Sequence, residues 1–260
     1  MPVTYSSYLK LEELLALQQP VSDGPEHDET LFIIIHQVYE LWFKELIHEL
    51  DYLMALLDKQ DTPRAQHTLK RILTILKVVV AQIDVLETMT PLEFLTFRAR
   101  LESGSGFQSF QFRELEFMLG GKSPAALERY PAGSETRKRL ERRFAEPTLW
   151  DAFLRFLAAK GLTIPKEALK RDVTKPVEPV PALHPVLIGV YRGNAVIASL
   201  CERLVDLDEG LQEWRYRHVK MVQRTIGTKM GTGGSAGAAY LMTTLNKPYF
   251  PDLWEIRAEL

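Results

Sequence analysis

The chain has 260 residues, of which 46% are hydrophobic and 25% are charged, a balance that excludes a largely disordered protein. Its 32 Lys and Arg residues against 34 Asp and Glu leave a formal charge of -2, which gives no electrostatic reason to bind nucleic acid. The uncharged stretch 231–246 is too short and too rich in Gly and Thr to span a membrane, and the N-terminus has no signal-peptide pattern, so we expect a cytoplasmic protein.

Helical periodicity runs through the whole chain and predicts an all-α fold, a helical bundle forming a single domain over residues 1–260. The first expected helix spans Glu12–Gln19, after a tyrosine-containing tip at Thr4–Tyr8. Asp28 then offers an N-cap for a helix of roughly eight turns over Glu29–Asp58, which contains no Gly or Pro.

Proline and glycine mark the next boundaries. A second long helix is predicted to open at Thr62–Pro63, with Thr as the cap and Pro as the first helical residue, and to end near Glu87. Another helix opens at Thr90–Pro91. The segment 103–106, Ser-Gly-Ser-Gly, breaks the pattern, and a further helix follows over Phe107–Leu119.

The middle of the chain, about residues 122–185, has shorter helical patterns separated by prolines, which indicates a small helical elaboration. A long helix returns from Asn194 to about Ile226. A segment with five glycines between positions 227 and 237 follows that helix. Such a segment lets the backbone approach a ligand closely.

Two histidines lie on apolar faces of the long helices. His36 shares a face with Phe32, and His218 shares one with Trp214. With the single cysteine, Cys201, a multi-cysteine metal site is excluded, so histidines become the expected metal ligands. Both could be core histidines with satisfied ring nitrogens, or they could face a cavity, as an axial haem ligand must.

Two other motifs were weighed as sites. Glu45 and His48 match the Glu-x-x-His arrangement of di-iron bundles, but such a site needs a second copy and the sequence has none. Residues 231–236 fit a dinucleotide-binding glycine pattern, but they follow a charged helix instead of a strand. Arg98, one turn after Phe94, has a planar guanidinium suited to a carboxylate, although an exposed arginine would look the same.

Four segments together resemble a known family. They are Phe32 to Gln37 running into Glu40-Leu41-Trp42, then Phe97-Arg98 with Ser105 to Ser109, then Glu213-Trp214-Arg215 with His218, and Gly231 to Ser235. In this order, and over nearly the whole chain, the sequence resembles the bacterial tryptophan 2,3-dioxygenases of the haem-dependent tryptophan and indoleamine dioxygenase superfamily.

The resemblance implies a dioxygenase with haem b, ferrous in the active state, enclosed in the helical bundle. It would insert both atoms of O2 across the indole C2–C3 bond of L-tryptophan to give N-formyl-L-kynurenine, the first step of the kynurenine pathway. By the same resemblance, His218 is the iron ligand and His36 is the distal histidine that accepts a hydrogen bond from the indole N–H. Arg98 would bind the substrate carboxylate, and Thr232 would contact the ammonium and carboxylate.

The resemblance also implies that Phe32 and Phe94 are walls of the indole pocket and that Ser105 and Gly106 lie beside the haem. It further implies a homotetramer in which residues 1–20 reach a neighbouring subunit. Three residues of that segment would contribute to the neighbour's substrate site: Tyr5, Tyr8 and Leu9.

Three questions stay open from the sequence. His36 can act as a base or can only orient the indole, since both roles use the same geometry. A protein of the same fold could instead rearrange a modified tryptophan. A helical bundle that binds a ligand without catalysis would carry the same histidines as core residues.

Overall fold

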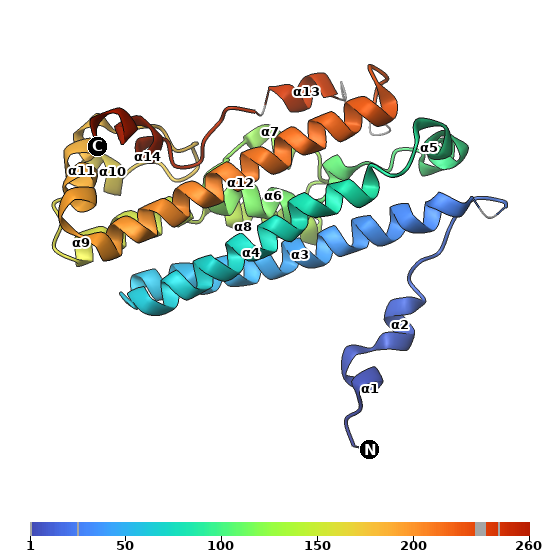
Figure 1. The fold of residues 1–260 in the computed structure, drawn as a ribbon, viewed down its shortest axis with the longest axis horizontal. Coiled ribbons are helices and arrows are strands. Elements are labelled where there is room, and N and C mark those ends of the chain that lie inside the picture. The colour runs from blue at the N-terminus through green and yellow to red at the C-terminus, as the bar shows by residue number, and fades with distance from the viewer. Residues whose placement is uncertain (1, 25, 232–237, 244) are drawn as a thin grey trace.

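The computed structural model describes residues 2–24, 26–231, 238–243 and 245–260. Every regular element within these ranges is a helix, and none of the described residues forms a strand, so the prediction of an all-α fold is confirmed (Figure 1). No helix of the described part is long and apolar enough to cross a membrane.

Three long helices form the frame of the molecule: α3 (His27–Asp58), α4 (Thr62–Leu86) and α12 (Ala195–Ile226). They lie side by side in Figure 1, with α4 against both of the others. The antiparallel register of α3 and α4 is fixed where the Tyr39 hydroxyl donates to the Val79 carbonyl at 3.1 Å and Gln82 donates to the Ile35 carbonyl at 2.9 Å.

Shorter helices complete the chain. The first part holds α1 (Tyr5–Leu9), α2 (Leu11–Leu15), α5 (Pro91–Arg98), η1 (Ala99–Leu101), η2 (Gly106–Gln108) and α6 (Phe110–Leu119). The middle holds α7 (Pro124–Leu127), α8 (Glu135–Ala145), α9 (Leu149–Ala159), α10 (Lys166–Leu169) and η3 (Pro181–Leu183). The last part holds α11 (His184–Gly193), α13 (Ala238–Met242), α14 (Pro251–Glu255) and η4 (Ile256–Glu259).

The main core lies where α3 and α4 meet α9 and α12. Leu50 and Leu53 of α3, Ile72 of α4, Trp150 of α9 and Leu204 of α12 are each at most 1% exposed. Full burial of side chains of this size stabilises a fold by about 1.5–3 kcal/mol each before entropy is counted. The same apolar stripes that made the helices recognisable in the sequence therefore hold the bundle together.

Several predicted helix boundaries are confirmed and others are wrong. The helix end at Asp58 is confirmed, as are the helix starts at Thr90–Pro91 and at Asn194, where the side chains of Thr90 and Asn194 cap α5 and α12 by accepting from backbone N–H groups. Asp28 does not cap α3, which starts at His27, two residues earlier than expected, with Glu26 as N-cap. The cap of α4 is Asp61 instead of Thr62, because its carboxylate accepts from the Arg64 N–H.

The predicted first and last residues of the N-terminal helix are also wrong. The helix expected over Glu12–Gln19 is α2, which ends at Leu15, and the tip expected before it is itself the helix α1; Lys10, in a left-handed conformation with φ 54°, separates the two. Neither α1 nor α2 contains a buried residue. In Figure 1 they project away from the bundle as an arm, which we define as residues 2–16.

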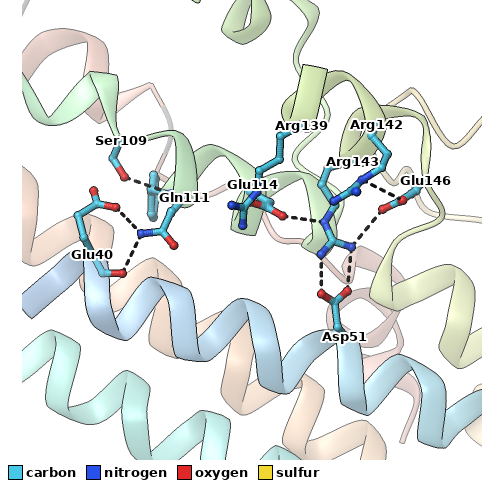
Figure 2. Close-up of polar contacts among 10 residues, drawn as sticks. Glu40, Asp51, Ser109, Gln111, Glu114, Arg139, Arg142, Arg143 and Glu146 are labelled. Carbon is cyan, nitrogen blue, oxygen red and sulfur yellow. Dashed lines mark hydrogen bonds and ion pairs between the residues drawn. The ribbon is translucent and has the colours of Figure 1, made fainter. Parts of the chain in front are cut away.

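An ion-pair cluster ties α8 and α6 to α3 (Figure 2). The fully buried Glu114 of α6 pairs with Arg139 at 2.6 Å and Arg143 at 2.8 Å, and Arg143 also binds Asp51 of α3. On the same side, Gln111 donates to the side chain and the carbonyl of Glu40 (Figure 2). These contacts fix α6 along α3, beside the cavity described below.

Candidate functional site

One end of the bundle encloses a cavity of about 260 Å³ between α3, α5, α6 and α12. Most of its surface is apolar, and its polar lining comes from a small number of charged and histidine side chains. Mostly apolar pockets with a few convergent polar groups are the usual form of ligand sites. The cavity is therefore the candidate site of the described residues.

His36 reaches the cavity from α3. Its Nδ1 lies 2.7 Å from the Phe32 carbonyl oxygen, one turn earlier. A carbonyl oxygen can only accept, so Nδ1 carries the proton and Nε2 keeps a free lone pair. Burial lowers the pKa of His36 below its ordinary value, which favours this neutral form.

His218 reaches the cavity from α12, across from α3. Burial lowers its pKa to about 4, with a smaller contribution from His36, so the imidazole is neutral at ordinary pH. The ring stacks on Trp214, one turn earlier, with centroids 5.2 Å apart and planes 8° apart. A neutral imidazole held in an apolar wall is suited to bind a metal ion.

An aromatic wall lies beside His36. The Phe32 ring is 4.1 Å from the His36 ring, 5.7 Å from Phe94 and 5.5 Å from Phe97, all between centroids. Phe94 and Phe97 meet edge to face at 90°. Such a wall offers a flat apolar ligand both area and preferred aromatic geometry.

Two cavity-lining arginines keep a buried N–H group without a hydrogen-bond partner among the described residues, namely the Nε atoms of Arg98 and Arg113. Arg98 donates one other N–H to the Met230 carbonyl at 2.6 Å. Since unpartnered buried donors are costly, the lining fits a ligand that carries acceptor oxygens such as carboxylates.

The polar end of the cavity is a network of charges. Glu116 of α6 binds Arg113, one turn before it, and Arg215 of α12 at 3.1 Å. Arg215 also donates to the hydroxyl of the buried Tyr249. Together with Arg98 and Glu40, these groups give the cavity three arginines against two carboxylates, a net positive lining. The lining therefore favours an anionic ligand.

Seven of the predicted site residues line this one cavity: Phe32, His36, Phe94, Arg98, Ser105, Gly106 and His218. Tyr5, Tyr8 and Leu9 lie on the arm instead, with Tyr5 75% and Tyr8 77% exposed. Thr232 lies outside the described residues, although its neighbour Gly231 lines the cavity.

Helical spacing placed Trp214 beside His218, and Trp214 does line the cavity, but sequence reasoning gave Glu40 no place there. Glu40 is four residues from His36 in the sequence, so the same spacing could have placed it beside that histidine. Of the basic residues around His218, only Arg215 lines the cavity, whereas Arg217 and Arg224 pair with Glu87 on α4. His48, the alternative metal ligand, is exposed on α3.

Known proteins resemble the chain along its whole length. A family model described as tryptophan 2,3-dioxygenase matches residues 1–161 and 180–260. A tryptophan 2,3-dioxygenase of Herpetosiphon aurantiacus is 63% identical over 99% of this chain and 98% of the relative. Proteins of the same name are 56% identical in Anaeromyxobacter sp. (96% of the relative) and 50% identical in Nocardioides sp. (95% of the relative), each over 99% of this chain.

Proposed function

The chain belongs to the tryptophan 2,3-dioxygenase family, and we propose that its cavity holds haem b on His218 and L-tryptophan against His36. Its reaction is the insertion of both atoms of O2 across the indole C2–C3 bond of L-tryptophan, which gives N-formyl-L-kynurenine. The observation that carries the assignment of residues is that two neutral histidines from two long helices line one apolar cavity.

The donor set fits a haem. His218 offers a neutral nitrogen in an apolar wall, and Arg113 and Arg215 offer positive charge at the polar end of the same cavity for propionates. Ser105 and Gly106 lie in the loop beside this space. When bound, ferrous haem supplies the activation of dioxygen. The protein would contribute the apolar slot, the His218 nitrogen that would bind the iron, and the exclusion of water.

The substrate is placed by its two ends. The Arg98 guanidinium binds the carboxylate, exchanging its contact with the Met230 carbonyl for a charge-assisted pair. Phe32 and Phe94 hold the indole ring. By resemblance to the family, Thr232, which lies outside the described residues, would contact the ammonium and carboxylate. Fixing both ends leaves the C2–C3 bond in one orientation, and such positioning contributes strongly to rate.

His36 determines the orientation of the indole ring itself. Because Nδ1 donates to the Phe32 carbonyl, Nε2 is the acceptor available for the indole N–H. A histidine that only accepts this hydrogen bond already fixes the ring, so we assign His36 an orienting role. The low pKa of its imidazolium makes it a weak proton acceptor, which also argues against full proton abstraction.

The arm completes the site in a neighbouring subunit. Tyr5, Tyr8 and Leu9 are exposed apolar side chains that the described part of their own subunit does not cover. We place them in the substrate site of a neighbour within a homotetramer. The buried, unpaired Cys201 fits the reducing cytoplasm as the compartment in which the enzyme works.

The experiment is turnover of L-tryptophan by the haem-loaded protein under 18O2, with the product analysed by mass spectrometry. We expect N-formylkynurenine labelled in both new oxygen atoms. A product with label in neither or only one position, or rearrangement without ring opening, would contradict this function. An unreactive protein with bound haem would favour the non-catalytic ligand-binding alternative.

A further inference from the structure

The segment that joins the arm to the bundle, residues 17–23, is bound to α3 at two places. Glu29, only 1% exposed, accepts hydrogen bonds from the Val21 N–H at 2.7 Å and the Ser22 N–H at 3.2 Å. Gln37 donates to the Leu17 carbonyl at 3.1 Å and accepts from the Gln18 amide at 2.6 Å. We call residues 17–23 the root of the arm, and these contacts fix the root on α3.

The contact at Glu29 is the stronger of the two. Burial alone would raise the pKa of its carboxyl, but the hydrogen bonds from the two backbone N–H groups help to outweigh burial and lower it. Hydrogen bonds to a charged acceptor are about twice as strong as neutral ones. Glu29 thus fixes the direction of the backbone at Val21 and Ser22.

A third contact joins the root to the segment that carries Arg98. Asp23 binds Arg100 of η1 at 2.6 Å, two residues after Arg98. Asp23 is 89% exposed, so this pair contributes little stability by itself. The pair nevertheless shows that the root lies against two elements that carry site residues. One is α3, which carries His36, and the other is the α5–η1 segment, which carries Arg98.

Among the described residues, the arm itself makes only local hydrogen bonds, as in the capping box of Thr4 and Ser7, and Leu15 is 72% exposed. The direction in which Tyr5 and Tyr8 leave the subunit is consequently set at residues 17–23. Because the arm projects away from the bundle, a small rotation of the backbone at residues 17–23 moves Tyr5 and Tyr8 over a much larger distance.

We propose that Glu29 and Gln37 are positioning residues that fix the root of the arm and thereby aim Tyr5 and Tyr8 into the neighbouring subunit's substrate site. This inference rests on the exchange of arms proposed above. Neither residue touches the substrate. Their effect passes through the arm to another subunit, which separates them from residues that act on their own cavity.

The test uses the haem-loaded full-length protein with Glu29→Ala, Gln37→Ala or the matched control Asp28→Ala. Within the described part of the chain, the Asp28 side chain hydrogen-bonds only the adjacent His27. A thiol-reactive spin label is placed at Glu12→Cys on the exposed face of α2, since the native Cys201 is fully buried. We expect higher label mobility and about a tenfold higher KM for L-tryptophan in both root variants, with the haem spectrum unchanged.

The same substitutions are then made in a protein that lacks residues 1–9. If the root acts through the arm, truncation raises KM and Glu29→Ala adds nothing further. An equal rise in the full-length and truncated proteins, or an unchanged label mobility, would overturn the proposal while leaving arm exchange intact. If truncation itself leaves KM unchanged, both the exchange and the positioning role are wrong. Gln37→Ala keeps the test valid should Glu29→Ala fail to fold.

Discussion

The indole ring of Trp214 lies parallel to the imidazole of His218, with 8° between the planes and 5.2 Å between the centroids. The two residues are one helical turn apart on α12, so the helix itself sets this stack. Trp214 is also held by Phe112 at 4.8 Å and by Phe43 at 6.3 Å. The orientation of His218 is therefore fixed by packing with no carboxylate among its described contacts.

Replacing Trp214 by leucine should weaken haem binding by about three- to tenfold, because an aromatic pair contributes about 0.5–1.5 kcal/mol beyond its buried area. Haem titration followed by absorbance measures the effect. Tyr216→Leu, an exposed position on the same helix, serves as the control. Equal haem affinity in wild type and Trp214→Leu would show that the stack does not position His218.

The pH dependence of kcat/KM should reflect protonation of the His36 imidazole. Only the neutral imidazole can accept the indole N–H, and burial lowers the folded pKa of His36 below 6.5. Activity is therefore expected to persist below pH 6.5 and to fall only as the pH drops through that lowered pKa. In His36→Ala the residual activity should be lower and should lack this acidic decline. A decline that begins above pH 6.5, or that survives in His36→Ala, would contradict the assignment.

Arg98→Ala should weaken L-tryptophan binding by about 10- to 150-fold, the range for losing a charge-assisted hydrogen-bonded pair of about 1.5–3 kcal/mol. Binding of tryptamine, which has no carboxylate, should change much less. Ligand titration of the haem-loaded protein compares the two. Equal losses for both ligands would mean that Arg98 supports the cavity without binding the carboxylate.

Asp208, which lies outside the site, should stabilise the folded protein. Its fully buried carboxylate accepts from the Tyr249 N–H at 2.8 Å, the Phe250 N–H at 3.0 Å and the Trp254 indole at 3.0 Å. All three groups donate to the same oxygen, Oδ2, so Asp208→Ala removes the acceptor and leaves buried donors unpaired, which should cost about 2–4 kcal/mol in the free energy of unfolding. Denaturant titration is the measurement, with exposed Asp206→Ala as the control. A change below about 0.5 kcal/mol would contradict this role.

Helical periodicity was sufficient to predict the frame of the fold, because α3, α4 and α12 are each long enough for an apolar face to be unmistakable. Short elements were harder to predict. The tip before the expected N-terminal helix is itself a helix, separated from α2 by a left-handed residue at Lys10, and nothing in residue type required that conformation. Likewise Asp61 and Thr62 are both good caps, and only the backbone decides between them.

In the site, spacing along a helix could show that His36 and His218 lie on apolar faces, but not that both faces line one cavity. The partners of Arg215, namely Glu116 of α6 and Tyr249 near the C-terminus, are 99 and 34 residues away in the sequence. Pairings at such distances depend on how helices pack. The roles of His36, Arg98 and the arm came from resemblance to a family, and they remain predictions.

The central claim is that His218 binds the haem iron in this cavity, and haem titration of the His218→Ala variant tests it most directly. The control is His48→Ala, a histidine exposed on α3. Circular dichroism should show both variants folded. We predict that His48→Ala binds haem as the wild type does. Loss of a residue that only supports a metal ligand lowers affinity by up to about 100-fold, and we predict a larger loss of haem affinity in His218→Ala. Haem bound to His218→Ala with unchanged affinity and an unchanged ferrous absorbance spectrum would contradict the account.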